Sequence, residues 1–379
     1  MRKEGVALSR VVIIGGLAES LVNFRGDLIK FMVSAGYEVI AMAGHTDTAT
    51  KAMIEALGVS FRPYPVERNG MNPCNDLQTL YALRVAFSEI KPDVVLAYTI
   101  KPVIFGGLAL RTLRLNVRFY ALITGLGLAF QPGGFKQKLL SGLVTCLYRW
   151  ALVRADKVIF QNKDNQRVFT DHQIIDEQRC VLVSGSGVNL KRFDVASMPQ
   201  GSLIFLTIAR LLGDKGLREY AEAAQNIKAR YPDINFQLVG PVDPSPDGIS
   251  ISEVMRWQNS GALQYLGSTD DVRPYIAQCH IYVLPSYHEG MPRTVLEAMA
   301  MGRPIITTDA PGCRETVVDG DNGFLVPIKD VTTLVEAMER FILKPELLEM
   351  MGKRSRKIAE ERFDVNKVNN DILQTMKLN

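Results

Sequence analysis

Residues 285–302 read PSYHEGMPRTVLEAMAMG, and this stretch decides how the chain is organised. The residues before it, 281–285 (IYVLP), form a short apolar run, which predicts a buried strand. Gly290 and Pro292 interrupt the chain, and from Arg293 onward the apolar residues recur at helical spacing. The stretch therefore predicts a strand, a tight loop and a helix start, with Glu289 in the loop and Glu297 about two turns further on.

This arrangement suits a ligand that carries both a phosphate and a sugar. Backbone N–H groups at a helix start have no partners within the helix, and together with the helix dipole they bind anions. A phosphate would repel the carboxylate of Glu289, so we expect that side chain to face a neutral, hydroxyl-rich group beside the phosphate. The alternative is a surface loop and a solvated helix without a ligand.

The same residues carry a family resemblance. Glu289-x7-Glu297 lies in a Pro-Ser-x-x-Glu-Gly-x-Pro frame and is followed by Gly302-x-Pro304-Ile305-Ile306. Two glutamates at this spacing are common on helices, but with the frame and the downstream run the stretch resembles the donor motif of retaining glycosyltransferases of family 4. The resemblance covers nearly the whole chain and is most specific over residues 210–326. It implies the GT-B fold: two Rossmann-like α/β domains with parallel sheets that face a central cleft.

Length and composition fit a two-domain globular protein. The chain has 379 residues, of which 47% are hydrophobic and 22% charged. No apolar run reaches the roughly 18 to 20 residues that span a bilayer, and we expect no signal peptide, because MRKEG leads directly into a predicted strand over 11–14. We expect reduced cytosolic thiols, without a disulfide framework or a zinc site, from five scattered cysteines: Cys74, Cys146, Cys180, Cys279 and Cys313.

The charge is unevenly distributed along the chain. Residues 1–195 contain 24 lysines and arginines against 16 aspartates and glutamates, a net charge of +8, whereas the remainder has a net charge of −4. A basic first half indicates an anionic partner. Nucleic acid, a lipid diphosphate and an anionic membrane surface all qualify.

The first half alternates strands and helices, which predicts a parallel sheet. A first strand over 11–14 ends at Gly15 and Gly16, a loop over 17–25 follows, and a helix is predicted over 26–35. A dinucleotide site is disfavoured because Gly-x-Gly-x-x-Gly is absent and no acidic residue ends the second strand. The resemblance implies instead that this loop faces the acceptor, with Gly16, Asn23 and Arg25 near it; a plain surface charge is the alternative for Arg25.

Two further strands of the first half end in candidate acceptor contacts. Lys101 follows a strand over 92–98 and is a candidate partner for an acceptor phosphate, or else a solvated lysine. Thr124 and Gly125 follow a strand over 117–123, and the glycine allows a close approach of the backbone to a ligand. Many members of the family place a histidine near this point, where this chain has Thr124. His45 could reach the cleft, although a solvated histidine is the simpler interpretation.

A predicted helix over 135–155 has two interpretations. Its apolar residues could pack on the sheet, which is the usual case. Alternatively, its aromatic and basic residues, among them Lys136, Lys138, Arg149 and Arg154, could lie in a bilayer interface. The second interpretation would agree with the basic first half and with a lipid-linked acceptor.

The second domain is predicted to begin after a polar linker over 194–201. We therefore place an acceptor-binding, membrane-facing domain at 1–195, completed by 363–379, and a nucleotide-sugar-binding domain at 196–362. The strand over 203–208 leads into Arg210 and Lys215, which match the family's Arg and Lys-Gly. A diphosphate needs cations, for which an arginine supplies a fork of donors and a lysine a point charge.

The resemblance assigns roles to these residues. Arg210 and Lys215 would hold the donor diphosphate, Glu297 the ribose and Glu289 the sugar, and the expected catalytic residues are Arg210, Lys215 and Glu289. No metal ion and no cofactor beyond the donor is expected, because the two cations would neutralise the diphosphate. The complete expected donor site is Arg210, Lys215, Gly240, Leu266, Glu289, Gly290, Met291, Pro292, Thr294, Val295 and Glu297.

Within the family, the chain looks most like bacterial enzymes of O-antigen, capsule and glycan assembly. These enzymes add an N-acetylhexosamine or hexose to a sugar on undecaprenyl diphosphate, which implies a peripheral location at the cytoplasmic face of the inner membrane for this chain. We expect a UDP-sugar donor, UDP-GalNAc as the narrower hypothesis, a polyprenyl-diphosphate-linked acceptor, peripheral contact with the membrane surface and no nucleic acid. The alternatives are a transferase with a soluble acceptor, a sugar-nucleotide epimerase, and a non-catalytic protein that binds membrane or nucleic acid.

Overall fold

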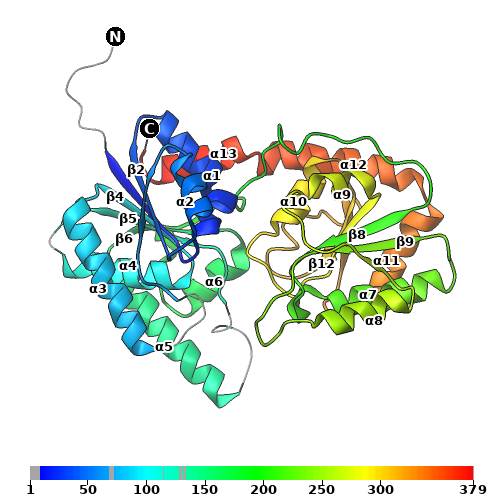
Figure 1. Cartoon of the computed structure of the whole chain (residues 1–379), viewed down its shortest axis with the longest axis horizontal. Helices are drawn as coiled ribbons and strands as arrows, with labels where there is room; N and C mark the ends of the chain where they lie inside the picture. Colours follow the sequence, from blue (N-terminus) through cyan, green and yellow to red (C-terminus); the bar gives the residue numbers. More distant parts are fainter. Residues whose placement is uncertain (1–8, 68–71, 114, 128–129, 131–133, 379) are drawn as a thin grey trace, which may run out of the picture. The chain divides into compact units, whose positions relative to one another are not determined.

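The computed structural model describes residues 9–67, 72–113, 115–127, 130 and 134–378 (Figure 1). The chain divides into two compact units. Unit 1 comprises residues 1–186 and 369–379, and unit 2 comprises residues 187–368.

Unit 1 is built on a seven-stranded parallel sheet in the order β3-β2-β1-β4-β5-β6-β7. Helices cover both of its faces, so the central strands are buried, with no exposed surface from Val11 to Ile14 (Figure 1). The strands are β1 (Arg10–Ile14), β2 (Glu38–Ala43), β3 (Ser60–Pro63), β4 (Val94–Tyr98), β5 (Arg118–Ile123), β6 (Ala155–Phe160) and β7 (Cys180–Leu182). The helices are α1 (Ala18–Ser34), α2 (Thr48–Glu55), α3 (Pro73–Ile90), α4 (Ile100–Thr112), α5 (Phe135–Leu152), α6 (Lys163–Asp171) and the short η2 (Glu177–Arg179).

Unit 2 is built on a six-stranded parallel sheet in the order β10-β9-β8-β11-β12-β13. Its strands are β8 (Ile204–Ile208), β9 (Asn235–Val239), β10 (Gln264–Tyr265), β11 (Ile281–Leu284), β12 (Ile305–Thr308) and β13 (Gly323–Val326). Its helical segments are η3 (Gly213–Lys215), α7 (Leu217–Lys228), α8 (Ile251–Asn259), α9 (Arg273–Gln278), α10 (Arg293–Ala300), α11 (Val331–Leu343), α12 (Glu346–Ile358) and the π-helical η4 (Ala359–Phe363).

Both sheets have the strand order of a Rossmann fold, in which the chain moves outward from the first strand and then reverses. The reversal falls between β1 and β4 in unit 1 and between β8 and β11 in unit 2. Ligands of open parallel sheets bind outside the carboxyl ends of the strands at such a reversal. Ligand sites are therefore expected at the loops after β1 and β4 and at those after β8 and β11.

The last helix, α13 (Val365–Thr375), returns the chain from unit 2 to unit 1, as predicted. Within unit 1 the carbonyl of Met376 accepts hydrogen bonds from the Tyr120 hydroxyl and the Arg118 guanidinium, both at 3.1 Å. The division between the units lies after Ser186, because Val188 pairs with the backbone of Phe363 and Val365. Residues 187–195 and 363–368, which the sequence assigns to the first domain, thus lie in unit 2.

Three elements differ from the prediction. Residues 18–25, expected as a loop, are the first turns of α1, because Ala18, Leu21 and Arg25 are all buried on one side of a helix. The helices α4 and α6 were not predicted; residues 102–110 of α4 are all apolar and almost all buried, so this helix lacks the amphipathic period.

Candidate active site

The loops after β8 and β11 bring Lys215 and Glu289 together in unit 2. Lys215 ends the short η3, and Glu289 lies between β11 and α10. The Nζ atom of Lys215 lies 2.8 Å from Oε1 of Glu289, and the Ser286 hydroxyl donates to the same oxygen at 3.0 Å. With 13% and 19% of their side chains exposed, both partners are largely but not completely shielded from solvent.

The environment keeps Lys215 charged. Burial alone would lower the pKa of its ammonium group, but the carboxylates of Glu289 and Asp214 outweigh burial and raise that pKa. Asp214 lies 3.9 Å from Nζ. The ammonium group of Lys215 is therefore charged at neutral pH, which is the form that can bind a phosphate.

Arg210 is held by a carboxylate of its own. Its guanidinium donates to Asp243 in the loop after β9. Burial alone would raise the pKa of Asp243, but hydrogen bonds from Ser245 and Arg210 outweigh burial and lower it. The Arg210 side chain is 45% exposed, so it can exchange partners without leaving the surface.

Glu297 lies about one turn along α10 and is almost completely buried. Its Oε1 atom lies 2.8 Å from Nε of Arg293, four residues earlier on the helix. Burial raises the pKa of Glu297, and the neighbouring Arg293 opposes this only in part. A buried carboxylate with one cationic partner has acceptor capacity left for hydroxyl groups.

Two glycines let the Glu289 loop pass between its neighbours. Gly216 has φ +68°, and a Cβ there would lie 2.1 Å from the carbonyl oxygen of Pro285. Gly312 has φ +80°, and a Cβ there would lie 2.3 Å from the carbonyl oxygen of Glu289. Because both neighbours are backbone, any larger residue would displace the loop that carries Glu289.

The remaining expected donor residues line the same end of the sheet. Pro292 is the N-cap of α10, which has no side-chain cap, and Gly290 and Met291 precede it in the loop. The Thr294 hydroxyl donates to the carbonyl of Ile208 at 3.3 Å, whereas Val295 is wholly buried, so only its backbone could meet a ligand. Gly240 (φ +155°), which follows β9, accepts a hydrogen bond from the Tyr265 hydroxyl, and Leu266 is half-buried beside it.

The expected acceptor residues of unit 1 differ in how far they are exposed to solvent. Asn23 is exposed on α1, and Gly16 is half-buried at the end of β1. Arg25, by contrast, is 2% exposed, with its guanidinium 5.1 Å from the centroid of the Tyr98 ring and 3.2 Å from the Ser186 hydroxyl. Arg25 therefore connects Tyr98 of β4 to Ser186, at the end of the first segment of unit 1. Any role of Arg25 in acceptor binding would consist of keeping these two residues in place.

Lys101 lies in the first turn of α4, where its Nζ atom is 2.6 Å from Oδ1 of Asp76 on α3. The side chain is thus already paired with a carboxylate, as Lys215 and Arg210 are in unit 2. Thr124 and Gly125 follow β5 and are half-buried, and a Cβ on Gly125 would meet no atom within 4 Å. The backbone at Gly125 is therefore open to a ligand.

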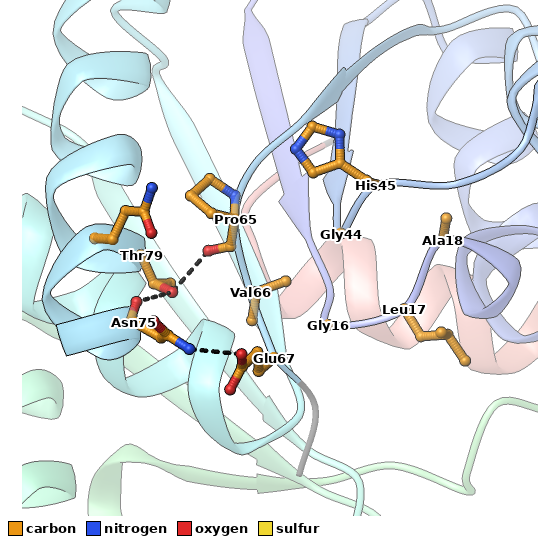
Figure 2. Close-up of a pocket in the computed structure, with 11 residues that line it drawn as sticks. Gly16, Leu17, Ala18, Gly44, His45, Pro65, Val66, Glu67, Asn75 and Thr79 are labelled. Atoms are coloured by element: carbon orange, nitrogen blue, oxygen red, sulfur yellow. Dashed lines mark hydrogen bonds between the residues drawn. The ribbon is translucent and has the colours of Figure 1, made fainter. Parts of the chain in front are cut away.

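A pocket of about 500 Å³ lies at the carboxyl ends of β1, β2 and β3 (Figure 2). Gly16, Gly44 and His45 line one side of it, and polar side chains of α3 and the loop after β3 line the other. Asn75 Nδ2 donates to Glu67 Oε1 at 2.5 Å, and the Thr79 hydroxyl donates to the carbonyl of Pro65 at 2.6 Å. The lining combines amide, carboxylate and imidazole groups with apolar walls, which suits a neutral, hydroxyl-bearing ring.

Comparison with known proteins identifies the family of the chain. The model of glycosyltransferase family 4 matches residues 21–192, and that of glycosyl transferases group 1 matches residues 190–358. The chain is 30% identical over 358 residues to the N,N'-diacetylbacillosaminyl-diphospho-undecaprenol alpha-1,3-N-acetylgalactosaminyltransferase of Campylobacter jejuni, covering 90% of this chain and 91% of that protein. The chain belongs to glycosyltransferase family 4.

Two further proteins are similar to this chain over much of their length. A UDP-Gal:alpha-D-GlcNAc-diphosphoundecaprenol alpha-1,3-galactosyltransferase of Escherichia coli is 25% identical over 309 residues, which is 77% of each chain. Among solved structures, Anabaena HepE in complex with UDP-glucose superposes with a TM-score of 0.77 and 19% identity, covering 97% of this chain and 99% of that one. The fold of this family 4 glycosyltransferase is GT-B, as the resemblance implied.

Sequence reasoning on this glycosyltransferase missed several residues that the structure brings to the candidate sites. Asp243 holds Arg210, and Ser286 holds Glu289; the pocket adds Glu67, Asn75 and Gln78. The only available signal for the pocket residues was their position after β3 and at the start of α3. In the described parts of the chain, no three His, Cys, Asp or Glu side chains gather as metal ligands would, and no helix is long and apolar enough to cross a bilayer.

Proposed function

We propose that this glycosyltransferase retains the anomeric configuration of its donor. It would move an N-acetylhexosamine, GalNAc as the narrower assignment, or a hexose from a UDP-sugar to a sugar linked to polyprenyl diphosphate. The observation that carries the proposal is the gathering of Arg210, Lys215, Glu289 and Glu297 at the carboxyl ends of β8 and β11. The names of the Campylobacter and E. coli relatives support the lipid-linked acceptor, and the HepE complex supports a UDP-sugar.

Arg210 and Lys215 would bind the donor diphosphate together with the backbone N–H groups at the start of α10. Each cation is paired with a carboxylate in the structure, so the diphosphate would replace one anionic partner by another and leave no cation buried without a partner. Two cations suffice to neutralise the diphosphate, so the proposal requires no metal ion. Activity should therefore persist in excess EDTA.

The two glutamates would divide the rest of the donor between them. Glu297, buried beside Arg293, would accept hydrogen bonds from the ribose hydroxyls, and Glu289 would accept them from the sugar. Because the diphosphate would take the place of Glu289 on Lys215, the carboxylate of Glu289 would be left beside the phosphate for the sugar hydroxyls. The two side chains would thus hold the phosphate and the sugar on either side of the bond between the anomeric carbon and the phosphate oxygen.

Transfer would take place on one face of the sugar. The bond from the anomeric carbon to the β-phosphate oxygen breaks while a bond to the acceptor hydroxyl oxygen forms, and the hydroxyl proton passes to the departing phosphate oxygen. UDP then leaves with the electron pair. Arg210 and Lys215 would stabilise the negative charge that grows on UDP in the transition state.

The acceptor would be bound by unit 1. The pocket at the ends of β1 to β3 has the size and the mixed polar lining for a sugar ring, and Lys101 would pair with an acceptor phosphate in place of Asp76. Such an acceptor resides in a membrane, so the enzyme would work peripherally at the cytoplasmic face of the inner membrane. It would take part in the synthesis of a bacterial surface polysaccharide or glycan.

A transfer assay tests the proposal. The protein is incubated with each of several UDP-sugars and with a polyprenyl-diphosphate-linked N-acetylhexosamine, and the products are analysed by mass spectrometry and by NMR of the anomeric proton. The expected result is one added sugar whose anomeric configuration equals that of the donor. The matched control is the same N-acetylhexosamine without lipid diphosphate.

Three outcomes would contradict the proposal. Equal transfer to the free sugar would indicate a soluble acceptor. Conversion of the UDP-sugar to an epimer without transfer would indicate an epimerase. An inverted anomeric centre would exclude the one-face mechanism.

A further inference from the structure

Helix α5 carries an apolar face that the fold leaves exposed. The exposed large side chains are Phe135 (83%), Leu139 (68%), Leu143 (58%), Trp150 (59%) and, just past the helix end, Val153 (56%). With the exposed Cys146 between them, they follow each other at intervals of three or four residues, so they form one continuous face of the helix. We call this set the α5 stripe.

The α5 stripe is not the face that packs α5 onto the fold. Tyr148, Ala151 and Leu152, on the other side of the helix, are buried, and α5 packs there against α4 (Figure 1). The ring of Tyr148 lies 4.9 Å from that of Phe169 on α6. Unit 1 thus has its core without the stripe, and the hydrophobic side chains of the stripe need another explanation.

Basic residues border the α5 stripe on both sides. At 100° per residue, Lys136 and Arg154 lie along one edge of the stripe, and Lys138 and Arg149 along the other. Arg111 of α4 stacks on the ring of Trp150, with its guanidinium carbon 5.6 Å from the ring centroid. No aspartate or glutamate occurs between Asp93 and Asp156.

An apolar face with basic edges matches one kind of surface. An anionic bilayer offers acyl chains to the apolar side chains and lipid phosphates to the flanking lysines and arginines, and tryptophan is favoured at that depth. A second copy of the chain fits less well, because a two-fold contact through the stripe would bring the basic edges of both copies together. Nucleic acid would use the charges but would leave the apolar side chains unexplained.

We infer that the α5 stripe is the membrane-docking surface of this enzyme, and that it lies in the headgroup region of an anionic bilayer. This inference rests on the proposed function in that a polyprenyl-linked acceptor places the substrate in a bilayer. It adds which face of which helix makes the contact. Apolar insertion and charge would act together, so binding should need anionic lipid and weaken as salt rises.

Vesicle binding tests the inference without donor or acceptor. The full-length protein is sedimented with vesicles of phosphatidylethanolamine and phosphatidylglycerol, and with phosphatidylcholine vesicles for comparison. Leu139→Glu/Leu143→Glu adds two charges to the stripe and should lower the bound fraction on anionic vesicles at least tenfold. The matched control, Leu343→Glu/Met350→Glu, makes the same kind of change at exposed apolar positions of α11 and α12 and should bind as the wild type does.

Fluorescence reports on the stripe directly. The chain has two tryptophans, so Trp257→Phe leaves Trp150 as the only one. Its emission should shift to shorter wavelength on anionic vesicles and be quenched by lipids with brominated acyl chains. If the protein binds the vesicles but the emission of Trp150 does not shift, another surface makes the contact and the inference is overturned.

Two further outcomes would overturn it. Equal vesicle binding by Leu139→Glu/Leu143→Glu and the wild type would exclude the stripe. A wild-type dimer in solution that becomes monomeric in this variant would assign the stripe to a contact between copies. If only the proposed function is wrong, the protein would still bind vesicles but would transfer no sugar. If only the membrane inference is wrong, sugar transfer would be unaffected by that result, and in either case Leu139→Glu/Leu143→Glu should keep the wild-type affinity for UDP.

Discussion

Lys215 and Glu289 are 74 residues apart in sequence, and their side chains meet at 2.8 Å across the ends of β8 and β11. The carboxylate that we assign to the sugar is therefore also the group that holds the ammonium assigned to the diphosphate. Arg210 has the same kind of relationship with Asp243. Both cations of the candidate donor site are thus kept in place by carboxylates of neighbouring loops.

Replacing Lys215 by alanine should lower kcat/KM about a thousandfold, because one donor to the developing charge on the leaving diphosphate is lost. The assay is transfer to a polyprenyl-diphosphate-linked sugar under steady-state conditions. Lys353→Ala, which removes a lysine from an exposed ion pair with Glu349, is the control and should behave as the wild type does. A near-normal rate in Lys215→Ala would refute the role of this lysine.

Replacing Glu289 by glutamine should affect sugar transfer and nucleotide binding differently. Glutamine keeps an acceptor oxygen for Ser286 and Lys215 but removes the charge that opposes the lysine. We therefore expect transfer to fall roughly a hundredfold while the affinity for UDP stays equal or increases. Calorimetry with UDP and turnover with the UDP-sugar give the two numbers. An equal loss of both would place Glu289 on the nucleotide instead.

Adding a side chain at Gly216 should destabilise the fold and weaken UDP binding. A Cβ would meet the Pro285 carbonyl, and the left-handed backbone adds strain, so Gly216→Ala should cost at least about 1–3 kcal/mol and weaken UDP binding by moving Lys215. Gly261 is a matched control, because it has φ +77° and open space around its Cβ position. Gly261→Ala should therefore show the backbone strain alone. Thermal unfolding with and without UDP compares the two, and equal effects would argue against the clash.

The sequence predicted the local structure around those residues of the candidate donor site that are close together in the chain. The strand, loop and helix around Glu289 follow from local periodicity and from glycine and proline positions, whereas the turn that carries Arg210 and Lys215 was expected from the family resemblance. The pairing of Glu297 with Arg293 lies within one helix and could also have been predicted. Asp243 could not, because its contact with Arg210 depends on how the loop after β9 folds back.

The helices show a second limit of sequence reasoning. In α5 the sequence supported both packing on the sheet and a bilayer interface, and the structure divides the apolar residues between a buried and an exposed face. In α1 the buried Arg25 and the polar residues around it masked the helical period over 18–25. Which face of a helix is covered depends on its neighbours, and those are set by the topology of the sheet.

Glu297 should make the stability of the protein depend on pH. Its folded-state pKa is raised by burial above the usual 4.5, so the folded protein holds this proton more tightly than the unfolded chain does. The contribution to stability is present below the ordinary carboxyl pKa and is lost as the pH rises through the folded-state value. Glu297→Gln has no such proton to lose. It should therefore gain stability over the wild type as the pH rises through this window, with little difference near pH 4.5, where the wild-type carboxyl is protonated in the fold.

The same substitution should weaken the enzyme, since a glutamine amide is a poorer acceptor for ribose hydroxyls than a carboxylate. Unfolding midpoints without ligand between about pH 4.5 and pH 8, and the affinity for UDP, measure both effects. Glu336→Gln changes a solvent-accessible glutamate of α11 and should leave the pH profile unaltered. A variant that loses UDP affinity and also loses stability at high pH would show that Arg293 outweighs burial, and that the Glu297 carboxylate supports the fold. If Glu297→Gln gains stability at high pH and loses affinity for UDP, the buried carboxylate of Glu297 destabilises the fold and serves ligand binding, as we expect.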